Sequence, residues 1–180
     1  MPVREAATAD AEVQLCTFRV GGEDYALDIM RVREIIHPLP ITPVPRAPAF
    51  VEGVIRLRGE VIPVVDVRKR FGLPLAAPGP RTKYLVVRVA GRRLALVVDE
   101  ISEVLRVRRS DLRPAPELVG LDAPRFFLGV CGGEGAAPAH RRGGDPSRLR
   151  LLLNVKALLD PATPGEAEAA RAQLEASRRA

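Results

Sequence analysis

Two arginines beside a tight turn are the residues of this chain best suited to bind a partner. Arg56 and Arg58 lie two positions apart in the segment V-I-R-L-R-G-E-V-I, directly before Gly59 and Glu60. Side chains two apart in a strand share a face, so the pattern predicts adjacent guanidinium groups. Such groups can bind carboxylates or backbone carbonyls of a partner. The alternative interpretation is a solvated strand face on which the arginines pair with Glu52 or Glu60.

Groups that could catalyse a reaction are not arranged in a recognisable pattern. The sequence contains neither a G-x-S-x-G nor a G-x-x-x-x-G-K motif, and no histidine is spaced with a carboxylate and a nucleophile. The carboxylates that could form a pair are Glu23, Asp24 and Asp28, or Asp99 and Glu100. Charged residues at turns are usually only solvated. We therefore expect a protein that is not an enzyme and carries no cofactor.

The cysteines and histidines are too few and too far apart for a metal site. Cys16 and Cys131 form no C-x-x-C motif, and His37 and His140 are the only histidines. We expect two free thiols and no metal.

The elements that hold the two arginines are two strands joined by the turn at Gly59. Val51, Ile55 and Leu57 alternate with charged residues, which is typical of a half-buried strand. The following run 61–67 is apolar on both faces, as in the interior of a small barrel. Gly53 is expected to lie at a bulge or beneath a close neighbouring backbone.

The chain repeats itself. Residues 15–36 align with residues 84–105, Gly53-Val54 aligns with Gly129-Val130, and the segment 64–68 aligns with 152–156. The third alignment makes Asp66 and Asn154 equivalent, each placed to cap a short helix. One strand-rich copy would have a thin core, so we expect two small barrels that share a core. The sequence leaves open whether the first strand crosses from one barrel to the other.

The repeat sets the expected organisation of the chain. We expect a disordered tail over residues 1–14 and one domain over 15–160. The domain contains copies at about 15–72 and 84–160. The second copy has a Gly-, Pro- and Arg-rich insertion at 131–148, predicted to be a mobile loop. Residues 161–180 are expected to form a tail or a weakly docked helix.

Composition limits the remaining classes of function. The net charge is +6, but 25 of the 28 basic residues are arginines spread along the chain, and the aromatic content is only 4%. This favours a compositional bias over a nucleic-acid surface. No apolar run reaches the roughly 20 residues that span a bilayer, and the charged N-terminus does not resemble a signal peptide. We expect a cytoplasmic protein without membrane insertion.

Several motifs together resemble a known family. They are L-R-G-E-V-I-P-V-V-D-V-R-K-R-F-G from Leu57, G-G-E-D-Y-A-L-D-I from Gly21, L-V-V-D-E-I-S-E-V-L from Leu96, R-P-A-P-E from Arg113 and L-L-L-N-V-K-A-L-L from Leu151. The chain resembles CheW-type chemotaxis coupling proteins from about residue 15 to 160. The resemblance implies a mainly β fold of two five-stranded SH3-like barrels on a shared core, with a groove between them, short helices and a C-terminal helix.

The resemblance also implies a function and a set of contact residues. It implies an adaptor that links the cytoplasmic tips of methyl-accepting chemoreceptors to a CheA-type histidine kinase in receptor arrays. The positions that match family sites for coupling or assembly, or adjoin them, are Val32, Glu34, Gly53, Arg56, Arg58 and Gly59. Arg56 departs from the Asn that is common in the family. The alternatives are a coupling protein of a non-flagellar pathway, such as surface motility, and a basic barrel that binds nucleic acid.

Overall fold

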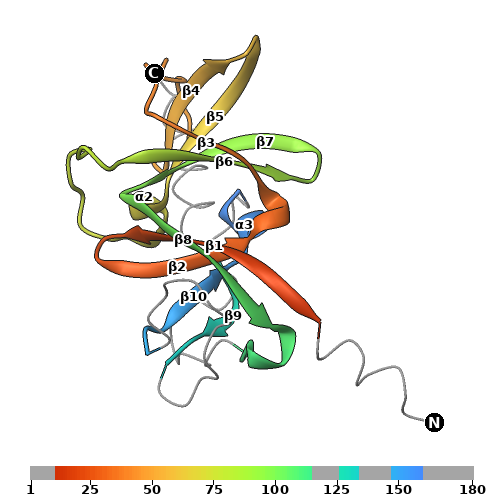
Figure 1. Ribbon diagram of the computed structural model, residues 1–180. Helices are drawn as coiled ribbons and strands as arrows, with labels where there is room; N and C mark the ends of the chain where they lie inside the picture. Colours follow the sequence, from red (N-terminus) through yellow and green to blue (C-terminus); the bar gives the residue numbers. More distant parts are fainter. Residues whose placement is uncertain (1–10, 115–125, 134–146, 160–180) are drawn as a thin grey trace, which may run out of the picture.

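The protein consists of two five-stranded sheets, in which most neighbouring strands are antiparallel, together with a few short helices (Figure 1). The computed structural model describes residues 11–114, 126–133 and 147–159. The first copy of the repeat supplies the strands β1 (Glu12–Val20), β2 (Glu23–Asp28), β3 (Val32–Ile36), β4 (Val51–Leu57) and β5 (Glu60–Asp66). The second copy supplies β6 (Lys83–Val89), β7 (Arg92–Val98), β8 (Glu100–Arg108), β9 (Phe127–Cys131) and β10 (Arg150–Leu153). The expected mainly β fold of two five-stranded units is confirmed.

Short helices lie between some of the strands and after the last one. They are η1 (Ile29–Arg31), α2 (Val67–Phe71), η2 (Arg109–Asp111) and α3 (Val155–Leu158). Asp66 caps α2, because its side chain accepts hydrogen bonds from the backbone N–H groups of Arg68 and Lys69. The equivalent Asn154 precedes α3 but makes no side-chain cap hydrogen bond, so the prediction of a matching cap was wrong there.

The two copies exchange their first two strands. Barrel A has the strand order β8-β1-β2-β10-β9, and barrel B has the order β3-β6-β7-β5-β4. The hairpin β1–β2 therefore lies among strands of the second copy, while β6–β7 lies among strands of the first. This answers the question that the sequence left open: the whole first hairpin crosses, in both directions.

Equivalent strands pair with the same register in both barrels. Val64 of β5 pairs in parallel with Ala95 of β7, and Leu152 of β10 pairs in parallel with Ala26 of β2. These are the residues that the sequence alignment of the copies makes equivalent. The shared register is what a duplication with exchanged hairpins requires.

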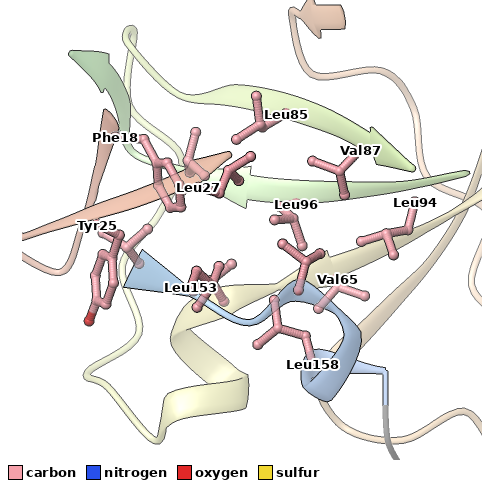
Figure 2. Packing of buried hydrophobic residues seen from close by; sticks show 14 of the residues in the cluster. Phe18, Tyr25, Leu27, Val65, Leu85, Val87, Leu94, Leu96, Leu153 and Leu158 are labelled. Atoms are coloured by element: carbon pink, nitrogen blue, oxygen red, sulfur yellow. The ribbon is translucent and has the colours of Figure 1, made fainter. Parts of the chain in front are cut away.

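The largest core cluster lies between the two sheets and draws on both (Figure 2). Barrel A contributes Phe18, Tyr25, Leu27 and Leu153, whereas barrel B contributes Val65, Leu85, Val87, Leu94 and Leu96, and Leu158 of α3 also belongs to it. Neighbouring positions face the barrel interiors instead, as period-2 alternation dictates. Val64, Val86 and Ala95 form a second cluster inside barrel B, while Leu15, Ala26 and Leu152 form a third inside barrel A.

The ends of the expected segments need one correction. The predicted tail over 1–14 is too long, because β1 begins at Glu12 and its residues 12–14 pair with 106–108 of β8. Most of the insertion 131–148 lies outside the described residues, as does the segment 161–180 with its predicted helix. Among the described residues, no helix is both long and apolar enough to cross a membrane.

Candidate functional site: a docking face on barrel B

The six candidate residues lie on the two edge strands of barrel B or in the turn that follows β4. Strands β3 and β4 are the ends of the order β3-β6-β7-β5-β4, and the chain between them returns to β4 through a bridge from Thr42 to Val54. We call the exposed part of this region the docking face. It consists of Val32, Glu34, Arg56, Arg58 and Gly59.

The turn of the docking face is tight and specific. Leu57 pairs with Glu60, which leaves Arg58 and Gly59 as a two-residue connection with φ of 50° and 86°. Two consecutive positive φ values fit the hairpin turns that match the twist of the strands. Arg58 therefore lies beyond the end of β4, and the prediction that it shares a strand face with Arg56 was wrong.

An ion pair joins the two edges of barrel B. The Nη2 atom of Arg58 lies 3.0 Å from Oε2 of Glu34, although the two residues are 24 positions apart. The Arg58 side chain is 76% exposed and that of Glu34 is 20% exposed. Such a surface pair stabilises a fold by at most about 1 kcal/mol. It does orient the guanidinium group and leaves most of its five donors available to a partner.

The alternative interpretation, in which the arginines pair with Glu52 or Glu60, does not hold for Arg58. Glu52 forms an ion pair with Lys69 at 2.5 Å, and Glu60 forms one with Arg93 at 3.4 Å. Arg58 instead reaches across to Glu34. No sequence signal pointed to this contact, because it depends on how the barrel closes.

Arg56 lies beside exposed apolar surface. Its cross-strand partner is Val61, whose side chain is 63% exposed, and Arg56 itself is exposed. On the other edge, Ile35 of β3 is 45% exposed. The docking face therefore combines cationic groups with a strand edge and lies beside exposed apolar side chains, which suits the addition of another barrel.

Val32 is only partly available to a partner. It is half-buried and packs against the core cluster between the sheets. The pairing of β3 with β6 shifts between Val32 and Glu34, so Arg33 is the extra residue of a bulge. The bulge places Glu34 toward Arg58 and leaves Arg33 exposed.

Gly53 is buried beneath the docking face and allows the chain at Thr42 to pack against β4. It has a φ of 142° and lies at a register shift between β4 and β5. A Cβ atom added there would lie 2.3 Å from the carbonyl oxygen of Thr42. The prediction of a bulge under a close backbone is confirmed. A Cβ atom added at Gly129, its equivalent in the repeat, would likewise lie 2.4 Å from the carbonyl oxygen of Arg113.

Four of the five carboxylates considered for catalysis have structural partners. Asp24 forms ion pairs of 3.2 Å with both Arg19 and Arg148. Asp99 forms an ion pair with Arg68 and accepts a hydrogen bond from the backbone N–H of Gly21 at 2.8 Å. Asp28 accepts the N–H of Met30 at the start of η1, and Glu100 pairs with Arg81.

The two cysteines are free and buried. Burial raises the pKa of Cys16 to about 11 and also raises the pKa of Cys131, whose rise is opposed by the nearby Arg150. Thiols held in the neutral form react slowly.

A second candidate surface lies on barrel A. A hollow of about 210 Å³ is bordered by apolar side chains of β1, β9 and the segment after η2, including Val13, Leu112 and Leu128. Leu128 is 62% exposed. Arg31 and Arg109 also line the hollow. The space between the two sheets is occupied by the shared core, so this hollow is a feature of barrel A.

Comparisons with known proteins give a consistent result. Residues 14–162 match the family model of the CheW-like domain. The chain is 42% identical over 122 residues to the chemotaxis protein CheW of Rhizobium meliloti, covering 68% of this chain and 79% of that protein. It is 37% identical over 126 residues to protein FrzA of Myxococcus xanthus, covering 69% and 78%. The solved structure of the scaffolding protein TtCheW from Thermoanaerobacter tengcongensis is similar, with a TM-score of 0.70, 28% identity and coverage of 82% and 88%.

Proposed function

Because the chain belongs to the CheW-like family and is by this membership a chemotaxis coupling adaptor, we propose that it joins a CheA-type histidine kinase to the cytoplasmic tips of methyl-accepting chemoreceptors. The adaptor works in the cytoplasm at receptor arrays. It performs no reaction itself, and the receptor state reaches the kinase through the geometry of the complex. This non-enzymatic role is supported by the ion pairs and hydrogen bonds that occupy four of the five candidate carboxylates, which are Asp24, Asp28, Asp99 and Glu100.

The docking face on barrel B is the proposed site for the kinase. The observation that carries this proposal is the exposed Arg58, which is held by Glu34 across the two barrel edges. A barrel-shaped kinase module would meet the edge of β3 and place carboxylates or carbonyl groups against Arg56 and Arg58. Gly53 acts indirectly, because it lets the chain at Thr42 lie against β4.

The apolar hollow on barrel A is the proposed site for the receptor. Its exposed Leu128 and the apolar residues Val13 and Leu112 suit the apolar face of a receptor helix. Placing the two partners on different barrels allows both to bind at once. Small differences in contact between two states of the array then suffice for coupling.

A coupling role in a non-flagellar chemosensory pathway is the second candidate function. The similarity to protein FrzA of Myxococcus xanthus favours it. The partner surfaces are the same in both cases, so the two candidates differ in which kinase and receptors bind. Affinity purification of the chain from its own cells, followed by identification of the kinase that co-purifies, distinguishes them.

The kinase site is tested by comparing two arginines in matched surroundings. Arg58 is 76% exposed and lies 3.0 Å from Glu34, and Arg81 is 74% exposed and lies 3.0 Å from Glu100. We expect Arg58→Ala to weaken binding of the kinase module at least tenfold in calorimetry, about 1.4 kcal/mol, with little change in melting temperature. Arg81→Ala should leave the affinity unchanged. Equal affinities for the two variants would contradict the proposal.

A further inference from the structure

A concave surface of barrel B is strongly basic. A hollow of about 800 Å³ is lined by Arg33 of β3, by Arg88 of β6 and by Arg92 and Arg93 of β7. Val61 and Leu159 also line it. We call it the basic hollow.

The positive charge of the basic hollow is poorly balanced. Among the described residues that line it, only Glu60 is acidic, and it pairs with Arg93 at 3.4 Å. Within the part of the chain that the structure describes, no ion pair reaches Arg33, Arg88 or Arg92. Like charges held together in a concavity repel one another and raise the local potential, which favours an anionic occupant.

The fold itself does not require these arginines. The equivalent hairpin of barrel A has Glu23 and Asp24 where barrel B has Arg92 and Arg93. There, Asp24 forms ion pairs with both Arg19 and Arg148. The same hairpin position is thus acidic in barrel A and basic in barrel B.

A segment of the same chain that could bind in the basic hollow begins directly after one of its lining residues. Leu159 lines the basic hollow, and the sequence continues from it as D-P-A-T-P-G-E-A-E. Residues 160–168 contain three carboxylates, Asp160, Glu166 and Glu168, and no basic residue. We infer that the segment 160–168 binds in the basic hollow and neutralises its arginines.

Reach and tethering support this intramolecular contact. Glu168 is nine residues beyond Leu159, so an extended chain reaches up to about 30 Å from the rim. A short tether gives the segment a millimolar effective concentration, so weak ion pairs suffice to hold it. Bound there, the segment shields the arginines from other anions. This shielding does not depend on which partners the docking face binds.

A spin label on the segment tests where it lies. Ala167→Cys places a single reactive thiol between Glu166 and Glu168, because Cys16 and Cys131 are buried and have raised pKa values. We expect enhanced NMR relaxation at the backbone amides of the β6–β7 turn. It should vanish in about 1 M salt, where the screening length is about 3 Å.

Two charge reversals make this measurement specific. Arg92→Glu should abolish the enhanced relaxation in the basic hollow, whereas Arg106→Glu, an equal change at an exposed position on β8, should leave it unchanged. Relaxation that is absent from the hollow at low salt, or that survives Arg92→Glu, would overturn the inference.

Binding of an external polyanion tests the shielding. Removing residues 160–180 deletes four acidic residues and three arginines, so the net charge rises only from +6 to +7. We nevertheless expect at least tenfold tighter heparin binding, and the same gain from combined Asp160→Asn, Glu166→Gln and Glu168→Gln in the full chain. Equal heparin affinity of the full and truncated chains would overturn the inference. So would equal binding of a poly-glutamate peptide to both, since the hollow would then be open to an outside acidic partner.

Discussion

Gly53→Ala should destabilise the protein by about 2–6 kcal/mol. The added Cβ would lie 2.3 Å from the Thr42 oxygen and 2.7 Å from Cγ2 of Ile41, so the chain at 41–42 must move away. That movement breaks the hydrogen bonds between Thr42 and Val54, of 2.8 and 2.9 Å, each contributing about 0.5–1.5 kcal/mol. The φ of 142° adds a strain of about 1–3 kcal/mol for a residue with a side chain.

Three other glycines separate the cost of the close contact from the cost of the strained φ. At Gly129 an added Cβ would lie 2.4 Å from the carbonyl oxygen of Arg113, but φ is outside the left-handed range. At Gly59 φ is 86°, but an added Cβ would meet open space. Gly79 has neither feature. Urea unfolding of the four alanine variants should therefore rank Gly53 as the most costly and Gly79 as neutral or slightly stabilising, with Gly129 and Gly59 between them.

The ranking also tests the role of Gly53 in docking. If Gly53→Ala unfolds at the same urea concentration as Gly79→Ala, the close contact with Thr42 is not a real constraint and the reasoning fails. If the variant is destabilised as expected, its kinase affinity should fall as well, because Thr42 and Val54 hold the edge of the docking face.

Three further predictions concern the site, the core and the topology. Exchanging the charges of the ion pair, by Arg58→Glu with Glu34→Arg, should change the free energy of unfolding by less than about 1 kcal/mol; kinase affinity measured by calorimetry should stay low, because the outward charge of the face is altered. Burial raises the pKa of Cys16 from 9.0 to about 11, so between these pH values the folded chain keeps a proton that the unfolded chain releases. The contribution of Cys16 to the free energy of unfolding should be fully present below about pH 9 and fall by up to about 3 kcal/mol as the pH rises to about 11. Denaturation of Cys16→Ala across this range should show a shallower fall, and an equal slope would contradict the assignment. Fragments 11–80 and 81–159 should each be unfolded alone by circular dichroism and fold when mixed, because each barrel needs strands from both; independent folding of either would contradict the exchange.

Local patterns in the sequence predicted the elements, whereas closure of the barrels decided the contacts. The hairpin turn at Gly59, the cap at Asp66 and the bulge at Gly53 depend on neighbouring residues and were predicted correctly. The pair of Arg58 with Glu34 depends on the two edges of barrel B meeting, which no local pattern encodes. The repeat indicated two barrels, but a swapped and an unswapped hairpin bury the same apolar faces. Periodicity could therefore not distinguish them.

The exchanged hairpins bear on how such an adaptor transmits a signal. Each copy of the repeat has strands in both barrels, and one core cluster fills the space between the sheets. Arg70 adds a further link, since its guanidinium carbon lies 4.3 Å from the ring centre of Phe50, next to β4, and 4.8 Å from that of Phe126, next to β9. Hinge motion between the barrels would have to expose this core and separate these rings, at a cost that small differences in receptor contact cannot supply. The docking face and the apolar hollow are therefore expected to keep a fixed separation. If they bind the kinase and the receptor as proposed, a movement of the receptor on barrel A shifts the kinase on barrel B as one body.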